Sequence, residues 1–353
     1  MHRFAFVIHP LKAKDAARKF PIAKYFPEWV IKKVYGSRKP FIGSFVDGIE
    51  SKTGVKTEGW FIICPLTPDM MMKELPLERV YERLEQCAEL AKSEGAEVMG
   101  LGAFTSVVGD GGVTVQKRTG FPITTGNSYT IATAVQGALK AANLVGVDPK
   151  NATLGVVGAT GSIGKTCARM LAPQFGSTIV VGRDEERTQL IADELDRARA
   201  TVQVADIKEA DVIITVTSAG ADLIYPEHLK QGAVVCDVSR PRDVSGKVAA
   251  ERPDVLVIEG GVVKVPGHPN FRIQFGFPEG TAYACMSETM MLALEGRIES
   301  FTLGKEVSVA QVEETMTWAD KHGFELAGFR SFEKAVPQEA IDRARVARGL
   351  KPA

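Results

Sequence analysis

The chain has 353 residues, of which 45% are hydrophobic and 24% charged, a composition typical of a globular enzyme and not of a disordered or fibrous protein. Its 43 basic and 43 acidic residues give a formal net charge of zero, which argues against a general nucleic-acid binder. No apolar run reaches the ~18 residues of a membrane span. Five scattered cysteines without a CxxC pair predict a cytoplasmic protein and no metal site.

The first part of the chain predicts a mixed α/β domain. Two extended runs, residues 44–49 and 56–64, flank a turn and predict a hairpin. Apolar residues at helical spacing over residues 77–91 predict a helix, and residues 98–104 follow as a short buried strand. Residues 105–128 are rich in Gly, Thr and Ser, which is typical of a loop-built site.

From residue 153 onward, strands and helices alternate. Runs rich in Val and Ile, separated by helical stretches such as residues 185–200, predict a parallel sheet covered on both faces. A long helix over residues 129–144 leads into this region. The expected strands comprise residues 153–157, 178–181, 201–204, 212–216, 233–238 and 255–258.

These patterns predict an α/β fold class with three parts, since a chain of this length exceeds one ordinary core. Residues 1–128 are expected to form an N-terminal α/β substrate domain. Residues 129–280 are expected to form a Rossmann dinucleotide-binding domain. Residues 281–353 are expected to form a mainly helical C-terminal region.

A glycine-rich turn is the strongest local signal. The strand at residues 153–157 runs into the sequence GATGSIG and then directly into a helix. Glycines let the backbone approach a pyrophosphate closely, and a helix N-terminus offers N–H groups and a favourable dipole to that anion. The spacing is GxxGxxG, in the strand-and-helix context that a dinucleotide site requires. The predicted cofactor-binding residues of this turn are Gly158, Ala159, Thr160, Gly161, Ser162, Ile163 and Gly164.

Charged residues after the next strand bear on the choice of cofactor. A carboxylate there binds the ribose hydroxyls of NAD, whereas arginines suit the 2′-phosphate of NADP. Arg183 and Arg187 therefore favour NADPH, and Asp184 leaves NAD open as the alternative. Thr217, just after a later strand, is a further expected cofactor contact.

One of the five cysteines stands out as chemically active. The other four fall on predicted strands or apolar helical stripes, where free cysteine is usually a small buried hydrophobe. Cys285 instead follows a helix-start sequence and falls in the first turn of a helix over residues 282–295. A helix N-terminus lowers the pKa of a thiol and favours the nucleophilic thiolate. The alternative is a packing cysteine beside Met286.

Several short segments together resemble a known family. In order and spacing they are similar to the cyanobacterial long-chain acyl-[acyl-carrier-protein] reductases, and the resemblance spans most of the chain. The segments are residues 101–106, 124–128, 157–161, 284–288 and 294–296. In that family a single cysteine attacks the fatty acyl thioester and NADPH reduces the acyl-enzyme to a fatty aldehyde. Cys285 matches that cysteine, so the resemblance implies this reaction here.

Such chemistry needs hydrogen-bond donors for the oxygen that becomes negative in each tetrahedral intermediate. Thr105, Ser106 and Asn127 lie in polar loops expected to face the cofactor cleft, and with Cys285 they are the predicted catalytic residues. For each of the three, ordinary turn hydrogen bonding is the alternative. His9 and His268 are further candidate proton donors, each with a structural role as its alternative.

The partner implied by the resemblance is acyl carrier protein or coenzyme A carrying a long-chain fatty acid. Residues 18–39 hold seven basic residues and one acid, with aromatic residues between them. Such a segment attracts acidic proteins, phosphates and anionic membrane surfaces, so peripheral membrane contact is a second expectation.

The main alternative function is a hydroxyl or keto oxidoreductase resembling shikimate dehydrogenase. That enzyme also joins an α/β substrate domain to a Rossmann domain, and the sequence TSAG after a strand is compatible with it. Such enzymes use a Lys/Asp pair in the substrate domain, however, and the segment NSYT at residues 127–130 lacks the Asp.

Overall fold

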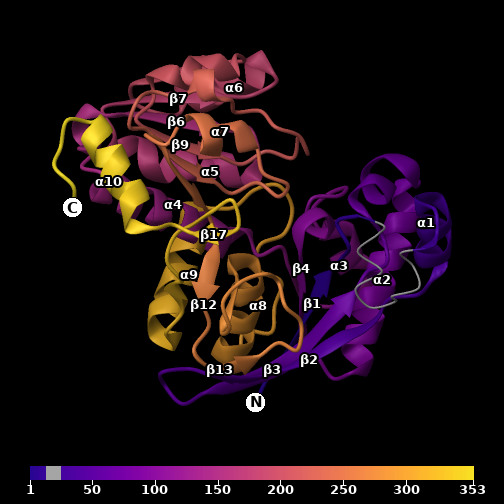
Figure 1. Ribbon diagram of the computed structural model, residues 1–353. Coiled ribbons are helices and arrows are strands. Elements are labelled where there is room, and N and C mark those ends of the chain that lie inside the picture. The colour runs from indigo at the N-terminus through magenta and orange to yellow at the C-terminus, as the bar shows by residue number, and fades with distance from the viewer. Residues whose placement is uncertain (13–24) are drawn as a thin grey trace. The chain divides into compact units, whose positions relative to one another are not determined.

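The structure is a computed structural model that describes residues 1–12 and 25–353 (Figure 1). The described chain forms two compact units. Unit 1 combines Met1–Gly126, Lys264–Glu306 and Thr317–Glu325, and unit 2 combines Asn127–Val263, Val307–Met316 and Leu326–Ala353.

Unit 1 is built on a six-stranded mixed sheet. Its strands are β1 (Arg3–Ile8), β2 (Phe41–Glu50), β3 (Lys56–Ile63), β4 (Val98–Leu101), β5 (Ile123–Thr124) and β13 (Gly267–Asn270). They lie in the order β13-β2-β3-β1-β4-β5, with β1 parallel to both β3 and β4 and β5 parallel to β4. β2 pairs antiparallel with β3, which confirms the expected hairpin.

Helices cover both faces of this sheet. α2 (Leu77–Ser93) buries an apolar stripe in one cluster with Met99 of β4. α8 (Ala284–Glu295) packs against β1 and β4, and ten of its twelve residues are buried. The neighbouring residue Gly100 faces α8, because side chains alternate along a strand. A Cβ atom at Gly100 would lie 2.1 Å from Thr289 Oγ1, so glycine is needed for this close approach.

Two expectations about unit 1 differ from the structure. The strand expected over residues 98–104 ends at Leu101, because Ala103–Ser106 form a 3₁₀ turn. Residues 281–306 belong to unit 1 and not to a separate C-terminal region. The reason is that α8 is apolar around most of its surface, and such a helix is stable only inside a core.

Unit 2 is built on a six-stranded parallel sheet. Its strands are β6 (Thr153–Val157), β7 (Ser177–Val181), β8 (Ala198–Thr201), β9 (Val212–Thr215), β10 (Val234–Asp237) and β11 (Leu256–Glu259). The order β11-β10-β9-β6-β7-β8 is that of a Rossmann fold, with the reversal between β6 and β9. The predicted α/β fold class with a Rossmann sheet is therefore confirmed.

Helices also cover the sheet of unit 2. α4 (Asn127–Leu144) packs on β9 and β10, and α5 (Ser162–Leu171) on β6 and β9. α6 (Glu185–Asp193) packs on β7 and β8. The helix expected over residues 185–200 is thus too long, since Arg197 adopts a left-handed φ of 54° and β8 begins directly after it.

The remaining elements are short or lie toward the C-terminus. These helices and strands are α1 (Glu28–Ser37), α3 (Val113–Thr119), α7 (Gly246–Glu251), α9 (Val309–His322), α10 (Gln338–Ala347), β12 (Val262–Lys264), β14 (Thr281–Tyr283), β15 (Glu325–Leu326), β16 (Arg330–Ser331) and β17 (Lys334–Ala335).

No helix in the described part of the chain is long and apolar enough to cross a bilayer.

A buried polar chain joins three separate parts of unit 1. The Nε2 atom of His322 lies 2.6 Å from Glu295 Oε1, and its Nδ1 atom lies 2.8 Å from Ser51 Oγ. These partners fit one tautomer of the neutral ring, in which Nε2 donates to the carboxylate and Nδ1 accepts from the hydroxyl. Burial lowers the pKa of His322, although the hydrogen bond to Glu295 partly opposes this. The folded chain therefore favours the neutral ring.

We expect unit 1 to lose stability as the pH falls below neutrality. Above pH 6.5, the ordinary pKa of histidine, the ring is neutral in both the folded and the unfolded chain. Below that pH the unfolded chain takes up a proton before the folded chain does, so the free energy of unfolding falls until the pH reaches the folded-state pKa. His322→Asn should cost about 1–3 kcal/mol near neutral pH, because Glu295 and Ser51 lose a buried partner. It should also flatten the fall in melting temperature between about pH 7.5 and 5.5. His268→Asn, at an exposed histidine, should keep the wild-type fall, and a wild-type fall in His322→Asn would contradict the assignment.

Candidate active site

The glycine turn of unit 2 joins β6 to α5 through Gly158–Gly161, and its shape depends on missing side chains. Gly158 has a φ of 85°, and a Cβ atom there would lie 2.3 Å from the carbonyl oxygen of Val216. A Cβ atom at Gly164 would lie 2.3 Å from the carbonyl oxygen of Gly158, so this glycine lets α5 pack directly on the turn. These two glycines therefore let the turn pack closely against the Val216 carbonyl group and against the first turn of α5.

The residues at the start of α5 fit the pyrophosphate of a dinucleotide. Ser162 is the first helical residue, and its buried Oγ atom has no hydrogen-bond partner among the described residues. A buried hydroxyl without a partner is costly unless a ligand satisfies it. The unpaired N–H groups of the first helical turn and the helix dipole favour an anion at the same point. The predicted turn thus has the chemistry of a phosphate cradle.

The charged residues after β7 divide into a capping acid and two arginines. Asp184 is the N-cap of α6, and its Oδ1 atom accepts from the backbone N–H of Arg187 at 2.9 Å. The guanidinium of Arg187 donates to the carbonyl oxygen of Thr160 at 3.5 Å, which places it beside the glycine turn. Arg183 is exposed. The Asp184 carboxylate thus stabilises its own helix, and Arg183 and Arg187 are the basic side chains at this end of the strand.

Thr217 follows β9 and is held by the buried carboxylate of Asp243. Its Oγ1 atom donates to Asp243 at 2.6 Å, and its backbone N–H donates to the same carboxylate at 3.1 Å. The hydroxyls of Thr215 and Ser239 donate to Asp243 as well. The structure thus places Thr217 at the carboxyl edge of the sheet, where such folds bind ligands, but uses its hydroxyl to hold the loop.

A second buried carboxylate, Asp237, ends β10 beside Asp243. It accepts hydrogen bonds from the backbone N–H groups of Ser239, Asp243 and Val244. Burial raises the pKa of Asp237 to about 6; the hydrogen bond from Val244 opposes this shift and the charge of Asp243 adds to it. The sequence did not reveal either aspartate, because neither an acid at the end of a strand nor one in the loop after it has a distinctive spacing.

Cys285 lies in unit 1 as the second residue of α8, and it is half-buried. Gly126, which follows β5, has a φ of 74°, and a Cβ atom there would lie 2.3 Å from Cys285 Cβ. Only glycine therefore fits at this point. This contact brings together Gly126 and Cys285, two residues of unit 1 that are far apart in the chain.

The electrostatic environment of Cys285 is opposite to the expected one. Burial raises the pKa of its thiol to about 12, and the carboxylate of Glu288 adds to the rise. The backbone N–H groups of Met286 and Cys285 lower the pKa, but they do not outweigh burial. The expectation that the helix terminus favours a thiolate is therefore wrong for this structure. Sequence reasoning also missed Glu288, although an acid three residues after the cysteine in an apolar helix is a visible signal.

The predicted oxyanion donors near β4 take part in local turn bonding. Thr105 Oγ1 donates to the carbonyl oxygen of Gly102 at 2.7 Å, and Ser106 Oγ donates to that of Ala103 at 2.7 Å. His9 accepts the backbone N–H of Phe104 at its Nε2 atom, and burial lowers its pKa. These side chains thus fix the 3₁₀ turn after β4. Asn127, the first residue of α4, belongs to unit 2.

Of the predicted basic segment, residues 18–24 lie outside the described part of the chain. The described part includes α1, where Trp29 is 68% exposed. Lys32 donates to Glu74 at 2.6 Å, so part of the positive charge is neutralised locally. Lys33 is exposed beside Trp29 on the surface of the helix.

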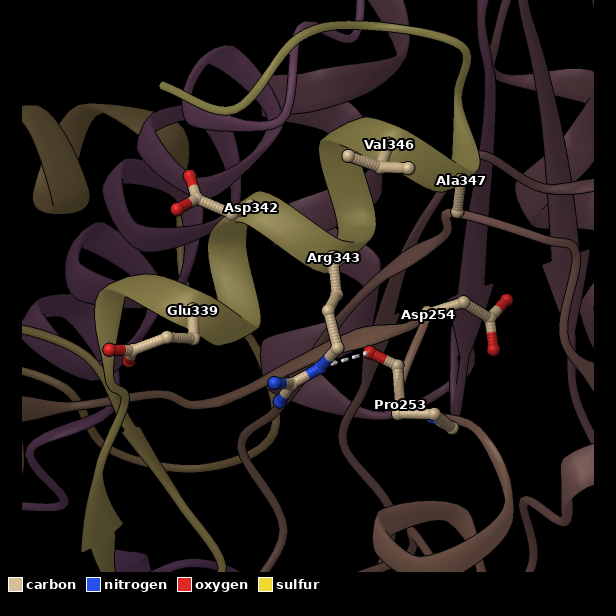
Figure 2. A pocket seen from close by; sticks show the side chains of 7 residues that line it. All are labelled: Pro253, Asp254, Glu339, Asp342, Arg343, Val346 and Ala347. Carbon is tan, nitrogen blue, oxygen red and sulfur yellow. Dashed lines mark hydrogen bonds between the residues drawn. The ribbon is translucent and has the colours of Figure 1, made fainter.

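A surface hollow of about 480 Å³ lies in unit 2, between α10 and the turn before β11 (Figure 2). Figure 2 shows Arg343 reaching across it, with Nε donating to the carbonyl oxygen of Pro253 at 3.2 Å. None of the residues that line the hollow is a predicted site residue, so it is distinct from both candidate sites.

Comparison with known proteins identifies part of unit 2. The family model for shikimate / quinate 5-dehydrogenase matches residues 140–259, which run from the end of α4 to the end of β11. The matched segment is a Rossmann domain of the kind found in NAD(P)-dependent oxidoreductases. The match does not extend to unit 1.

Two relatives match most of the chain. The protein named aminotransferase PigE from Serratia sp. is 32% identical over 313 residues, which are 84% of this chain, but the chain spans only 35% of the length of that protein. The long-chain acyl-[acyl-carrier-protein] reductase of Synechococcus elongatus is 27% identical over 329 residues, which are 89% of this chain and 95% of the reductase. The similarity to the reductase is thus modest in identity and extends over nearly the whole chain.

Two solved structures that cover most of the chain are distantly similar to it. L-tryptophan dehydrogenase from Nostoc punctiforme is 11% identical, with 91% of this chain and 80% of the other covered and a TM-score of 0.41. A chorismate mutase/shikimate 5-dehydrogenase fusion protein from Clostridium acetobutylicum is 15% identical, with 90% and 96% covered and a TM-score of 0.39.

Proposed function

We propose that this chain uses NADPH to reduce a long-chain fatty acyl thioester, carried by acyl carrier protein or coenzyme A, to a fatty aldehyde through an acyl-Cys285 intermediate. The observation that carries the proposal is the position of Cys285. All five cysteines are described, and Cys285 alone is not fully buried. It also lies in the first turn of α8, in a segment that resembles the reductase family. The 95% coverage of the Synechococcus reductase supports the same function.

In the proposed reaction the sulfur of Cys285 attacks the thioester carbonyl carbon, and the carrier leaves as a thiol. Bound NADPH would supply the hydride that reduces the acyl-cysteine. The tetrahedral species then expels the cysteine sulfur and releases the aldehyde, and the sulfur takes up a proton. The backbone N–H groups of Cys285 and Met286, which face the sulfur, are suited to the developing oxyanion. Asn127 remains a predicted donor, because the hydroxyls of Thr105 and Ser106 bond to their own turn.

The proposed cofactor preference follows from the different roles of the three charged residues after β7. Asp184 caps α6, whereas Arg187 lies beside the glycine turn and Arg183 is exposed. Guanidinium groups bind phosphate through charge-assisted hydrogen bonds, so these two residues favour the 2′-phosphate of NADPH.

Replacing Arg183 by Ala should therefore raise the KM for NADPH by about 10-fold or more, the effect of losing a charge-assisted hydrogen bond of about 1.5–3 kcal/mol. The KM for NADH should change by less than about 2-fold, because NADH lacks the phosphate. Steady-state kinetics with both cofactors measure this. Arg199→Ala, at an arginine that pairs with Glu209, is the matched control. Equal changes for NADPH and NADH in Arg183→Ala would defeat the assignment.

The carrier and its docking surface form part of the proposal. Acyl carrier protein is acidic and coenzyme A carries phosphates, so either is attracted by a basic surface. Lys33 and Trp29 on α1 are exposed and are suited to this contact or to a peripheral contact with an anionic membrane.

The test of the proposed reaction is the conversion of palmitoyl-coenzyme A, or the same acyl chain on acyl carrier protein, to hexadecanal with NADPH. Cys285→Ala should lose aldehyde formation by at least about 10³-fold, because no acyl-enzyme can form. Cys236→Ala, at a buried cysteine of β10, should keep it. Gas chromatography of the aldehyde measures both.

A second candidate function rests on the family match to residues 140–259. A hydroxyl or keto oxidoreductase of the shikimate dehydrogenase type would use the same cofactor domain and would not need Cys285. If Cys285→Ala keeps full activity on a hydroxy acid and the wild type forms no aldehyde, this second function replaces the first.

A further inference from the structure

Glu288 is a fully buried carboxylate in the middle of unit 1. Its Oε1 atom accepts from Thr302 Oγ1 at 2.8 Å and from Thr124 Oγ1. The two threonine hydroxyls also lie 2.9 Å from each other. A buried carboxylate carries a large desolvation cost, so its place in an otherwise apolar helix calls for a reason.

The position of Glu288 relates it to Cys285. Residues three apart on a helix are neighbours, with about 5–6 Å between their Cβ atoms. Helical side chains also lean toward the N-terminus, so the Glu288 side chain extends in the direction of Cys285. Its partner Thr124 accepts the backbone N–H of Gly126 at 3.4 Å, and Gly126 is the residue that contacts Cys285. The carboxylate and the two hydroxyls thus form a hydrogen-bonded cluster that adjoins Cys285 through Gly126, and the charge of the carboxylate acts on the thiol.

The thiol needs a proton acceptor because it is protonated at neutral pH. Burial is the main cause of its raised pKa, and a thiol is a far weaker nucleophile than a thiolate. The strands packed against α8 are β1, β3, β4 and β14, and of these only β1 and β3 carry charged side chains. Those side chains form pairs of their own: Arg3 with Glu58 at 2.8 Å, and Lys56 with Glu50 at 3.1 Å. On α8 itself, Glu295 is bound by Lys321 and His322.

We propose that Glu288 accepts the proton of the Cys285 thiol as the sulfur attacks the thioester. The proposal rests on the proposed function. The sulfur–carbon bond to the acyl group forms while the S–H proton moves to Glu288. The bond between the acyl carbon and the carrier sulfur then breaks, and the same proton passes from Glu288 to the carrier sulfur. Glu288 is again a carboxylate, and this half-reaction consumes no oxidant or reductant.

The proposal predicts how the acylation rate depends on pH. In the wild type the proton moves inside the site, so the rate of Cys285 acylation should be nearly constant between about pH 6.5 and 8.5. In Glu288→Gln the thiolate must form by losing its proton to water. The rate should then fall by about 100-fold or more near neutral pH and rise about tenfold for each pH unit. Glu288→Asp, which keeps a carboxylate, should be slower than the wild type with a flat profile.

The measurement is single-turnover acylation by palmitoyl-coenzyme A without NADPH, followed by intact-protein mass spectrometry of quenched samples. Glu299→Gln, at an exposed carboxylate paired with Arg297, is the control and should match the wild type. A merely structural role of Glu288 would lower the rate of Glu288→Gln without changing its slope, which would overturn the proposal. A wild-type rate that rises tenfold per pH unit would overturn it without any variant. If the wild type forms no acyl adduct, the proposed function fails and the role of Glu288 fails with it.

Discussion

The burial of α8 against the sheet of unit 1 is the constraint on which the proposed chemistry depends. Ten of its twelve residues are buried, and glycines at positions 100 and 126 let neighbouring backbone approach it so closely that one methyl group would collide. A helix held in this way cannot shift without opening the core, so the sulfur of Cys285 has a fixed position. The same burial keeps the thiol protonated. The packing that fixes the sulfur therefore also means that the thiol needs a nearby proton acceptor.

Two acidic side chains of unit 2, Asp184 and Asp243, accept hydrogen bonds from nearby backbone N–H groups. Asp184 caps α6, and Asp243 holds the loop after β9 through Thr217. These bonds fix the loops at the carboxyl edge of the sheet, where Rossmann folds bind ligands. The groups proposed to bind the cofactor are the glycine turn, the Ser162 hydroxyl and the side chains of Arg183 and Arg187. Loops that are held by hydrogen bonds and still offer a few unsatisfied polar groups are typical of a preorganised binding site.

The sequence predicted the features that depend on periodicity and on glycine, and it failed where tertiary burial decides. The parallel sheet of unit 2 and the turn at Gly158 follow from Val/Ile runs and from a strand–turn–helix order. The packing of residues 281–306 into unit 1 and the raised pKa of Cys285 depend on neighbours distant in sequence. A local rule for helix termini cannot include the desolvation that those neighbours impose. The hydrogen-bond partners of Asp243 and Glu288 also come from other segments, so the burial of these two carboxylates could not be predicted from the local sequence.

In the proposed reaction the acyl group moves to Cys285 before any reduction takes place. Rapid-quench chromatography of free coenzyme A, with wild-type protein and palmitoyl-coenzyme A in the absence of NADPH, tests it most directly. We expect a burst of about one coenzyme A per chain, followed by one equivalent of hexadecanal when NADPH is added. Release of coenzyme A only after NADPH is present would contradict the account, because the hydride would then reach the thioester while it is still on its carrier.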